Sequence, residues 1–208
     1  MSYDYLFKVI FVGGPCVGKT ALTKKLILNQ FPYQYDATIG VDFFTKSTTI
    51  DNMNIKTHIW DTAGQKCFSS IITTYFTGVA GAAIIFDVGR KSSFNQVDYW
   101  REEIDKRKLT NHTPAMILIA NKVDKKHREI SKEEAEQYAE KHNMLYCETS
   151  AKDNLNVQEF YKMLIERIYN TADLENPQES KGIRKSIVSQ LKIKIKPERN
   201  LCYCCGIQ

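Results

Sequence analysis

The chain has 208 residues, an apolar fraction of 43% and a formal net charge of +5. This length and apolar content suit one compact α/β domain with an extension. No apolar run approaches the roughly 18 residues that span a bilayer, and the N-terminus lacks the apolar stretch of a secretory signal. We therefore expect a chain that is neither secreted nor membrane-spanning and that stays on the cytosolic side.

The positive charge is concentrated near the C-terminus. Residues 181–199 contain seven basic residues and a single acidic one, Glu198, so this stretch carries +6 and leaves −1 for residues 1–180. A basic tail on a nearly neutral body indicates an anionic surface as its partner. Of the six cysteines, three are scattered, as free thiols of cytosolic proteins usually are, and three crowd the last seven residues without zinc-type spacing.

The predicted elements alternate between strands and helices. Strands are predicted at 5–12, 41–50, 53–60, 82–86, 115–120 and 145–147, and helices at 21–29, 131–142 and 157–168. The first strand is an almost unbroken apolar run, which is typical of burial on both faces. Asp51-Asn52 is a hairpin signal between the second and third strands, and Ser131-Lys132-Glu133-Glu134 is a capping box.

This alternation predicts an α/β fold with a doubly wound, mostly parallel six-stranded sheet and one antiparallel edge strand. After Asn170 the sequence becomes polar and is interrupted by proline. We therefore expect a folded domain at 1–171 and a flexible tail at 172–208. In such sheets ligands bind beyond the carboxyl ends of the strands, and four short motifs stand at those positions.

The first motif is Gly13-x4-Gly18-Lys19-Thr20, between the first strand and the first helix. It matches a phosphate-binding loop, in which backbone N–H groups surround the phosphates, the lysine reaches the outer phosphates and the threonine hydroxyl ligates Mg²⁺. The predicted nucleotide contacts here are Gly14, Pro15, Cys16, Val17, Gly18, Lys19, Thr20 and Ala21. A purely structural glycine-rich turn is the alternative, and the flanking strand and helix favour phosphate binding.

Two further motifs select the base. Asn121-Lys122-x-Asp124 follows a strand, and an Asp carboxylate can accept from guanine N1–H and the 2-amino group, a pairing that adenine does not offer. Such residue pairs also occur in ordinary loops, so the position after the strand is what favours guanine. Ser150, Ala151 and Lys152 follow the last strand and add a backbone amide for guanine O6 and a lysine over the base.

With these motifs the chain resembles a small GTPase of the Ras superfamily, and within it a Rab, over about residues 6–171. Residues 38–43 and 56–65 are close to the Rab switch signatures, and 75–78 and 84–88 are looser matches. The Rho-type helical insert and the Ran-type acidic tail are missing, and Ser2 stands where an Arf carries its myristoylated glycine. The resemblance implies the P-loop GTPase fold and a GTP/GDP switch in vesicle and membrane trafficking.

The resemblance also assigns roles at the phosphate end. Thr20 and Thr38 would ligate Mg²⁺, and Asp61 would hold a Mg²⁺-bound water. The Gly64 amide would contact the γ-phosphate and Gln65 would orient the attacking water, giving slow hydrolysis that an activating protein stimulates. A solvated loop amide is the bland alternative for Gln65.

Two aromatic residues complete the predicted GTP-binding set. Phe31 would pack against the guanine, with an ordinary core position as its alternative, and Tyr35 is assigned to the same site. Implied partners are GTP and GDP, an exchange factor, a GTPase-activating protein, a Rab escort protein, a dissociation inhibitor and effectors that bind the switch regions.

Three residues depart from the Rab pattern. Pro15 replaces a small residue and lacks an N–H, but in the family the phosphate-facing amides begin one residue later, at Cys16, so phosphate binding should survive. What Pro15 puts in question is the clearance above the γ-phosphate for a catalytic water or an incoming arginine. Lys66 and Cys67 follow Gln65 where the family usually has Glu and a basic residue, so the identity of the regulators is in doubt. A GTP-bound membrane scaffold with negligible hydrolysis is therefore the alternative function.

The C-terminus Cys204-Cys205-Gly206-Ile207-Gln208 resembles the doubly prenylated ending of Rabs and also fits a poor single prenylation box on Cys205. Lipid on Cys204 and Cys205, with the basic tail, would anchor the protein to the cytoplasmic face of endomembranes and leave a cytosolic pool. Because the positive charge lies in this tail and not across a folded face, we expect no nucleic-acid partner.

Overall fold

The computed structural model describes residues 3–34, 36–65, 72–107 and 113–175, with the side chains of 172–175 excepted. A six-stranded sheet has the order β2-β3-β1-β4-β5-β6. Its strands are β1 (Tyr5–Val12), β2 (Val41–Ile50), β3 (Met53–Thr62), β4 (Gly81–Asp87), β5 (Ala115–Asn121) and β6 (Leu145–Thr149). Every pairing is parallel except that of the edge strand β2 with β3. The predicted sheet is confirmed.

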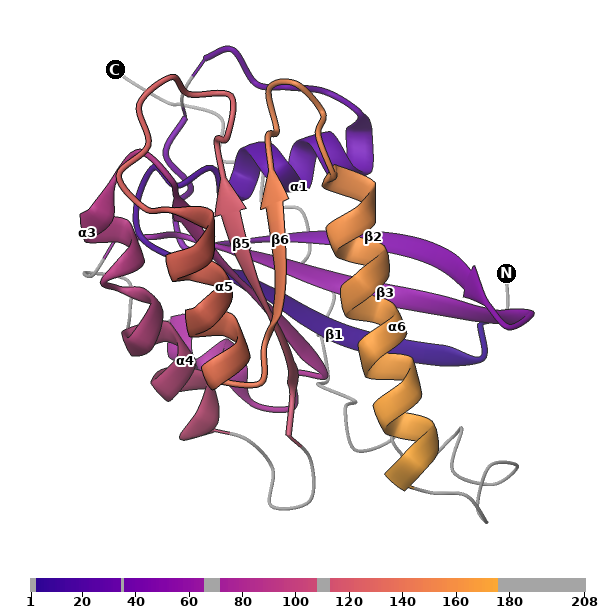
Figure 1. The fold of residues 1–208 in the computed structure, drawn as a ribbon. Coiled ribbons are helices and arrows are strands. Elements are labelled where there is room, and N and C mark those ends of the chain that lie inside the picture. The colour runs from indigo at the N-terminus through magenta and orange to yellow at the C-terminus, as the bar shows by residue number, and fades with distance from the viewer. Residues whose placement is uncertain (1–2, 35, 66–71, 108–112, 176–208) are drawn as a thin grey trace, which may run out of the picture.

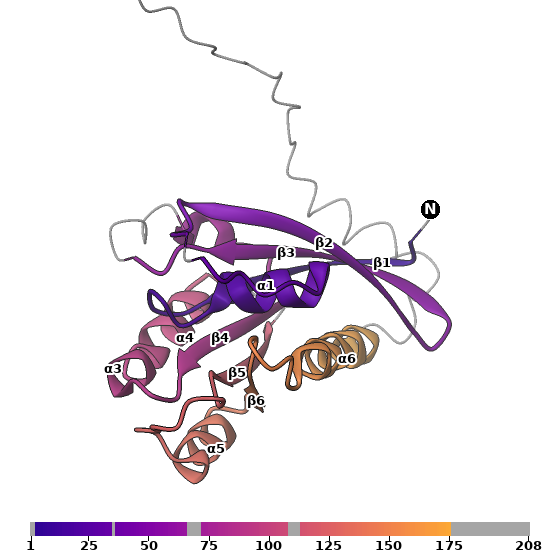
Figure 2. The same ribbon diagram turned by 90° about the horizontal axis from the view of Figure 1, so that it is seen from above.

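Helices cover both faces of the sheet (Figures 1 and 2). They are α1 (Lys19–Leu28), α3 (Lys91–Phe94), α4 (Val97–Asp105), α5 (Lys132–Lys141) and α6 (Val157–Glu175), with a 3-10 turn, η2, at Thr73–Phe76. The helices α1 and α6 share one apolar core with the sheet, and η2, α4 and α5 share the other.

Alternation along the central strands explains the two cores. In β1, Val9 and Phe11 point into the core beneath α1 and α6, whereas Ile10 and Val12 point into the core beneath α4. Successive side chains of a strand leave opposite faces of the sheet, so a strand covered on both sides must be apolar throughout. This is why β1 appears in the sequence as an apolar run interrupted only by Lys8.

The predicted elements are all present, and their ends differ modestly. The strand at 5–12 has the predicted bounds, and the Ser131 hydroxyl accepts from the Glu134 N–H as a cap of α5. The helix α6 extends to Glu175, seven residues beyond the prediction, so its last turn lies in the stretch assigned to the tail. Residues 176–208 lie outside the described residues.

Three elements between positions 73 and 105 were not predicted from the sequence: η2, α3 and α4. In α4 the buried residues Val97, Trp100 and Ile104 have the three- and four-residue spacing of a helix face. That signal was available, but it is surrounded by charged residues. The helix α3 has only four residues, too few to show a periodicity.

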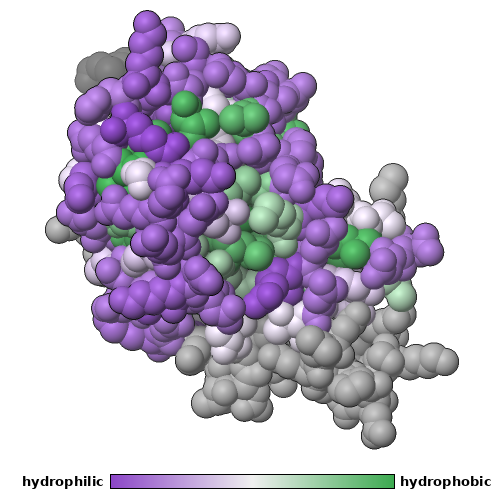
Figure 3. Space-filling view, in the orientation of Figure 1, coloured by the Kyte–Doolittle hydropathy of each residue, from purple (hydrophilic) through white to green (hydrophobic). Residues whose placement is uncertain are grey.

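A groove of about 580 Å³ lies beside the edge strand β6 and is lined partly by Ala139, Met144 and Leu145. Figure 3 shows apolar residues gathered in the middle of this face, whereas hydrophilic residues cover most of the rest.

Within the described part of the chain no helix has the length and apolar character needed to cross a membrane.

Candidate nucleotide-binding site

The four motifs meet at the carboxyl ends of the parallel strands. The loops after β1, β3, β5 and β6, together with the segment after α1, line one cavity of about 330 Å³. Of the predicted residues, the cavity is lined by Pro15, Cys16, Gly18, Lys19, Thr20, Ala21, Phe31, Thr38, Gly64, Gln65, Asn121, Lys122, Asp124, Ala151 and Lys152. The fold therefore gathers the phosphate and base motifs around a single space.

The remaining predicted residues fall into two groups. Buried positions that are not part of the lining are occupied by Gly14, Val17, Asp61 and Ser150. Residues outside the described part of the chain are Tyr35, Lys66, Cys67, Cys204 and Cys205. The roles assigned to this second group stay predictions.

The phosphate-binding loop is held through its carbonyl groups. Each of the five consecutive carbonyls at positions 13–17 accepts a hydrogen bond from a side chain. The donors are Lys19 for Gly13 and Gly14 (2.9 Å each), Arg90 for Pro15, Lys122 for Cys16 (2.5 Å) and Asn121 for Val17 (2.8 Å). Because the carbonyl and N–H of one peptide point in opposite directions, these bonds also fix where the loop amides point. The loop is preorganised for an anion.

The two motif glycines are required by close contacts. Gly13 and Gly18 have φ of +145° and +98°. A Cβ on Gly13 would stand 2.2 Å from the Ile85 carbonyl oxygen, and one on Gly18 would stand 2.5 Å from Asn121 Nδ2. Any larger residue would strain the backbone at either position. It would also displace the end of β4 at Gly13, or Asn121 of the guanine motif at Gly18.

Lys19 is a buried cation at the centre of the loop. Burial lowers its pKa to about 8, and the charge of Asp61 opposes part of this shift. An anionic ligand beside the ammonium would favour its charged form and reverse the effect of burial. The site is therefore electrostatically suited to a phosphate, whose negative charge would raise the pKa of Lys19 back toward its ordinary value.

Asp61, at the end of β3, is fully buried, and neither of its carboxylate oxygens has a hydrogen-bond partner in the structure. Burial raises its pKa to about 6, although the nearby Thr20 hydroxyl and Lys19 ammonium oppose this. The hydroxyl oxygens of Thr20 and Thr38 lie 2.7 Å apart. The two hydroxyls, which bond to each other, and the carboxylate, which has no hydrogen-bond partner, form the kind of oxygen-rich set that Mg²⁺ prefers, directly or through water. The residues fit the predicted metal.

The base end of the cavity is held together by hydrogen bonds between its two motifs. Ser150 donates to the Asp124 carboxylate at 2.7 Å and accepts from the Asp153 N–H at 3.0 Å. The fully buried Asn121 accepts from the Thr149 hydroxyl at 3.1 Å. Asp124 is exposed in the cavity wall, so one of its oxygens is oriented by Ser150 while the carboxylate remains accessible to a base.

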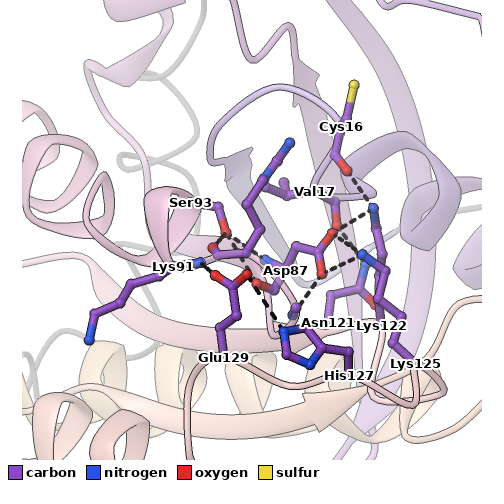
Figure 4. A network of polar contacts seen from close by, with 12 residues as sticks. Cys16, Val17, Asp87, Lys91, Ser93, Asn121, Lys122, Lys125, His127 and Glu129 are labelled. Carbon is purple, nitrogen blue, oxygen red and sulfur yellow. Dashed lines mark hydrogen bonds and ion pairs between the residues drawn. The ribbon is translucent and has the colours of Figure 1, made fainter.

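Asp87, at the end of β4, is a positioning residue that the sequence analysis did not identify. Its buried carboxylate pairs with Lys122 at 2.9 Å and with Lys125 at 2.8 Å, as Figure 4 shows. Burial would raise the pKa of Asp87, but hydrogen bonds from the two lysines outweigh it and lower the pKa. Lys122 is thereby held between Asp87 and the Cys16 carbonyl, which joins the base motif to the phosphate loop.

The segment after α1 closes the cavity with aromatic side chains. Phe31 and Tyr33 form an edge-to-face pair with ring centroids 5.5 Å apart, and both line the cavity. Tyr33 is 91% exposed, so its ring does not fill the hydrophobic core and is accessible to a ligand in the cavity. Phe31 and Tyr35 are the aromatic residues predicted for the site from the sequence. Tyr33 is not among them, although its place two residues after Phe31 could have suggested it.

Gly64 brings the loop after β3 against the phosphate loop. A Cβ on Gly64 would lie 2.4 Å from the Gly14 oxygen and 2.5 Å from Pro15 N, so only glycine permits this approach. Gln65 is the next residue, exposed and in the cavity wall. The predicted γ-phosphate contact and the predicted water-orienting residue therefore stand beside the phosphate loop.

Comparison with known proteins agrees with this geometry. Residues 8–170 match the sequence model of the Ras family. The match spans β1 to α6 and so includes every loop that lines the cavity. Ras-family proteins typically hold Mg²⁺ with their nucleotide, which the oxygen ligands at Thr20, Thr38 and Asp61 suit. The chain belongs to the Ras family: it is a small GTPase, a switch that binds guanine nucleotides and hydrolyses GTP.

Proposed function

We propose that this small GTPase is of the Rab type and acts in vesicle and membrane trafficking, where it recruits effectors in its GTP-bound state. The proposal includes slow intrinsic hydrolysis that an activating protein accelerates. It also includes an exchange factor, a Rab escort protein, a dissociation inhibitor and a prenyl anchor on the cytoplasmic face of endomembranes.

The observation that carries this proposal is the placement of the two segments that resemble Rab switch signatures. Their strands β2 and β3 pair so that Phe43 lies opposite Trp60. The ring centroids of Phe43 and Trp60 are 5.0 Å apart, and those of Trp60 and Tyr75 are also 5.0 Å apart. We call Phe43, Trp60 and Tyr75 the aromatic row; it joins three elements beside the nucleotide cavity.

The aromatic row and its surroundings suit a protein partner. Phe43 is 44% exposed and the nearby Ile39 is 82% exposed. Exposed apolar side chains that gather beside a functional site are typical of protein docking surfaces, and Phe43 and Ile39 are four positions apart in the segment that leads from the cavity into β2. Because Thr38 lines the cavity one residue before Ile39, the nucleotide state can be communicated to this surface over a very short distance.

The switching chemistry follows from the residues of the cavity. Lys19 binds the outer phosphates, Gln65 orients the attacking water, and Mg²⁺ neutralises phosphate charge when it is bound. Thr38 and Gly64 are the groups expected to lose a partner when the γ-phosphate leaves. Their release would loosen both segments that carry the aromatic row and so lower effector affinity.

The proposed membrane attachment rests on the tail, which lies outside the described residues. Two prenyl chains on Cys204 and Cys205 would supply stable anchoring, since a single lipid binds membranes only marginally. The basic residues between 181 and 199 would add attraction to anionic lipid.

A transport assay tests the proposal. Thr20→Asn, which removes a predicted Mg²⁺ ligand, should slow the passage of a secreted or endocytosed reporter, and Gln65→Leu should accumulate on the endomembrane that the wild type marks. Lys91→Ala is the matched control, because Lys91 is an exposed cation outside the cavity lining. Normal transport with both cavity variants would contradict the trafficking role but would not contradict the assignment of the chain as a GTPase.

A further inference from the structure

Arg90 reaches the phosphate-binding loop from a separate part of the chain. It lies between β4 and α3, and its guanidinium donates to the Pro15 carbonyl, 75 positions away in the sequence. Pro15 has no N–H, so this carbonyl is its one backbone hydrogen-bonding group. Arg90 thus holds the loop at the residue that departs from the Rab pattern.

The backbone that presents Arg90 is held from several directions. The Arg90 N–H donates to the Asp87 carbonyl at 3.0 Å, and the Ser93 hydroxyl donates to the Arg90 carbonyl at 2.7 Å. The Gly89 N–H donates to the Asp87 carboxylate at 3.0 Å, and the Lys91 N–H to Glu129 at 2.6 Å. Figure 4 shows Asp87, Lys91, Ser93 and Glu129 around this turn. A long side chain leaving a fixed backbone can position its partner reproducibly.

The contact lies at the γ-phosphate end of the site. Gly64, the predicted γ-phosphate contact, approaches the Pro15 nitrogen from the other direction. Lys19 donates to the Gly13 and Gly14 carbonyls at 2.9 Å each and Arg90 donates to the next carbonyl, that of Pro15, so the two cations hold consecutive peptides of the loop. The guanidinium is therefore part of the electrostatic surroundings of the lysine that binds the outer phosphates.

We propose that Arg90 is a positioning residue for guanine-nucleotide binding, which anchors the phosphate-binding loop through Pro15 and adds positive charge at its γ-phosphate end. Anchoring keeps the loop amides oriented and slows release of both nucleotides. The added charge favours GTP over GDP, because GTP carries the additional phosphate. The inference rests on the GTP-binding part of the proposed function and not on trafficking.

The test compares full-length variants that separate the hydrogen bond from the charge. Arg90→Ala removes both, Arg90→Gln keeps an N–H donor without charge, and Arg90→Lys keeps the charge. Lys91→Ala is the control, because its side chain is 59% exposed and pairs with Glu134 at 3.8 Å. Dissociation rates of a fluorescent GDP and of a non-hydrolysable fluorescent GTP analogue are measured with Mg²⁺ at low and high salt.

Arg90→Ala should release both nucleotides about three- to tenfold faster than the wild type, the range expected for an exposed charge-assisted hydrogen bond. The GTP analogue should be affected more than GDP, and this difference should shrink at high salt. Arg90→Gln should recover part of the loss common to both nucleotides, and Arg90→Lys should recover the preference for the GTP analogue.

Release rates of Arg90→Ala equal to those of Lys91→Ala would overturn the inference. Where Arg90→Ala does not give folded protein, Arg90→Gln against Arg90→Lys supplies the same comparison. Equal rates for those two variants and the wild type would also overturn it. A wild-type chain that fails to retain either nucleotide would instead contradict GTP binding itself, so the two failures are distinguishable.

Discussion

Base recognition is predicted to depend on the carboxylate of Asp124 and on the hydroxyl of Ser150 that orients it. Asp124 is accessible in the cavity wall, and Ser150 fixes one of its oxygens at 2.7 Å. A carboxylate held in this way can accept from both donors on the guanine edge. We therefore expect that a substitution of Asp124 changes which base is bound, whereas a substitution of Ser150 changes only how tightly it is bound.

Asp124→Asn should shift the preference from guanine toward xanthine nucleotides, which have an oxygen where guanine has its 2-amino group. Ser150→Ala should lower GTP affinity by about tenfold without changing the preferred base, since it removes only an orienting hydrogen bond. Competition by GTP, XTP and ATP against a fluorescent GDP measures both effects. Equal competition by ATP and GTP in the wild type would contradict the guanine assignment.

Gln65 is the residue on which GTP hydrolysis is predicted to depend. We expect intrinsic single-turnover hydrolysis on the order of 10⁻⁴ to 10⁻² per second, and a slower rate in Gln65→Leu. Nucleotide affinity should be unchanged, because the side chain is exposed and its predicted partner is water. Identical hydrolysis rates in both proteins would favour the alternative of a GTP-bound scaffold.

At the scale of elements, β1 contains one residue that conflicts with its burial. Lys8 is buried within this otherwise apolar strand, donates to the Thr77 carbonyl at 3.0 Å and lies 5.4 Å from the Trp60 ring. Burial lowers its pKa to about 8 from 10.5. The hydrogen bond and the ring therefore compensate only part of the desolvation of the ammonium.

This pKa makes stability depend on pH with a definite sign. Between pH 8 and 10.5 the unfolded chain binds more protons at Lys8 than the folded chain, so the folded state gains stability as the pH rises. Lys8→Met should raise the free energy of unfolding at pH 7 by on the order of 1 kcal/mol, after allowance for solvent screening.

Denaturant unfolding of wild type and Lys8→Met with saturating GDP, at pH 7 and pH 10, measures the change. The advantage of Lys8→Met should shrink at the higher pH, because the wild-type lysine then loses its proton in the folded state. Lys19 titrates in the same range, but it is present in both proteins and cancels in the comparison. A difference that does not vary with pH would show that Lys8 is not desolvated at a cost.

At the scale of the whole molecule, the proposed function needs two separable parts, a nucleotide domain and a lipid-bearing tail. The cavity is built entirely from residues of the Ras-family match, whereas the proposed lipidation sites lie outside it. Nucleotide binding should therefore be independent of membrane attachment.

Cys204→Ser with Cys205→Ser should leave the full chain soluble and able to bind GTP. Neutralising the basic residues between 181 and 199 should only redistribute the protein among membranes, since each contributes about 1 kcal/mol near an anionic surface. Fractionation of cell extracts, with GTP binding measured on each fraction, tests both statements. Complete sedimentation of the double-serine chain with membranes would place the anchor elsewhere.

The sequence alone determined the sheet, its single antiparallel pairing and the end of the sheet where the site lies. Local patterns suffice for this, because a strand buried on both faces must be apolar throughout and loops after parallel strands converge at one edge. The same reasoning failed for α4, whose three buried positions are separated by charged residues, and for the four-residue α3.

Only the tertiary structure decided which side chains hold the motifs in place. Asp87 pairs with Lys122, and Arg90 contacts Pro15, across 35 and 75 positions of the chain. No local spacing encodes such contacts, because they depend on how far each loop extends once the sheet has fixed the strand ends. The sequence therefore determined the chemistry of the nucleotide site, and the assembled fold decided the long-range contacts that give it a rigid geometry.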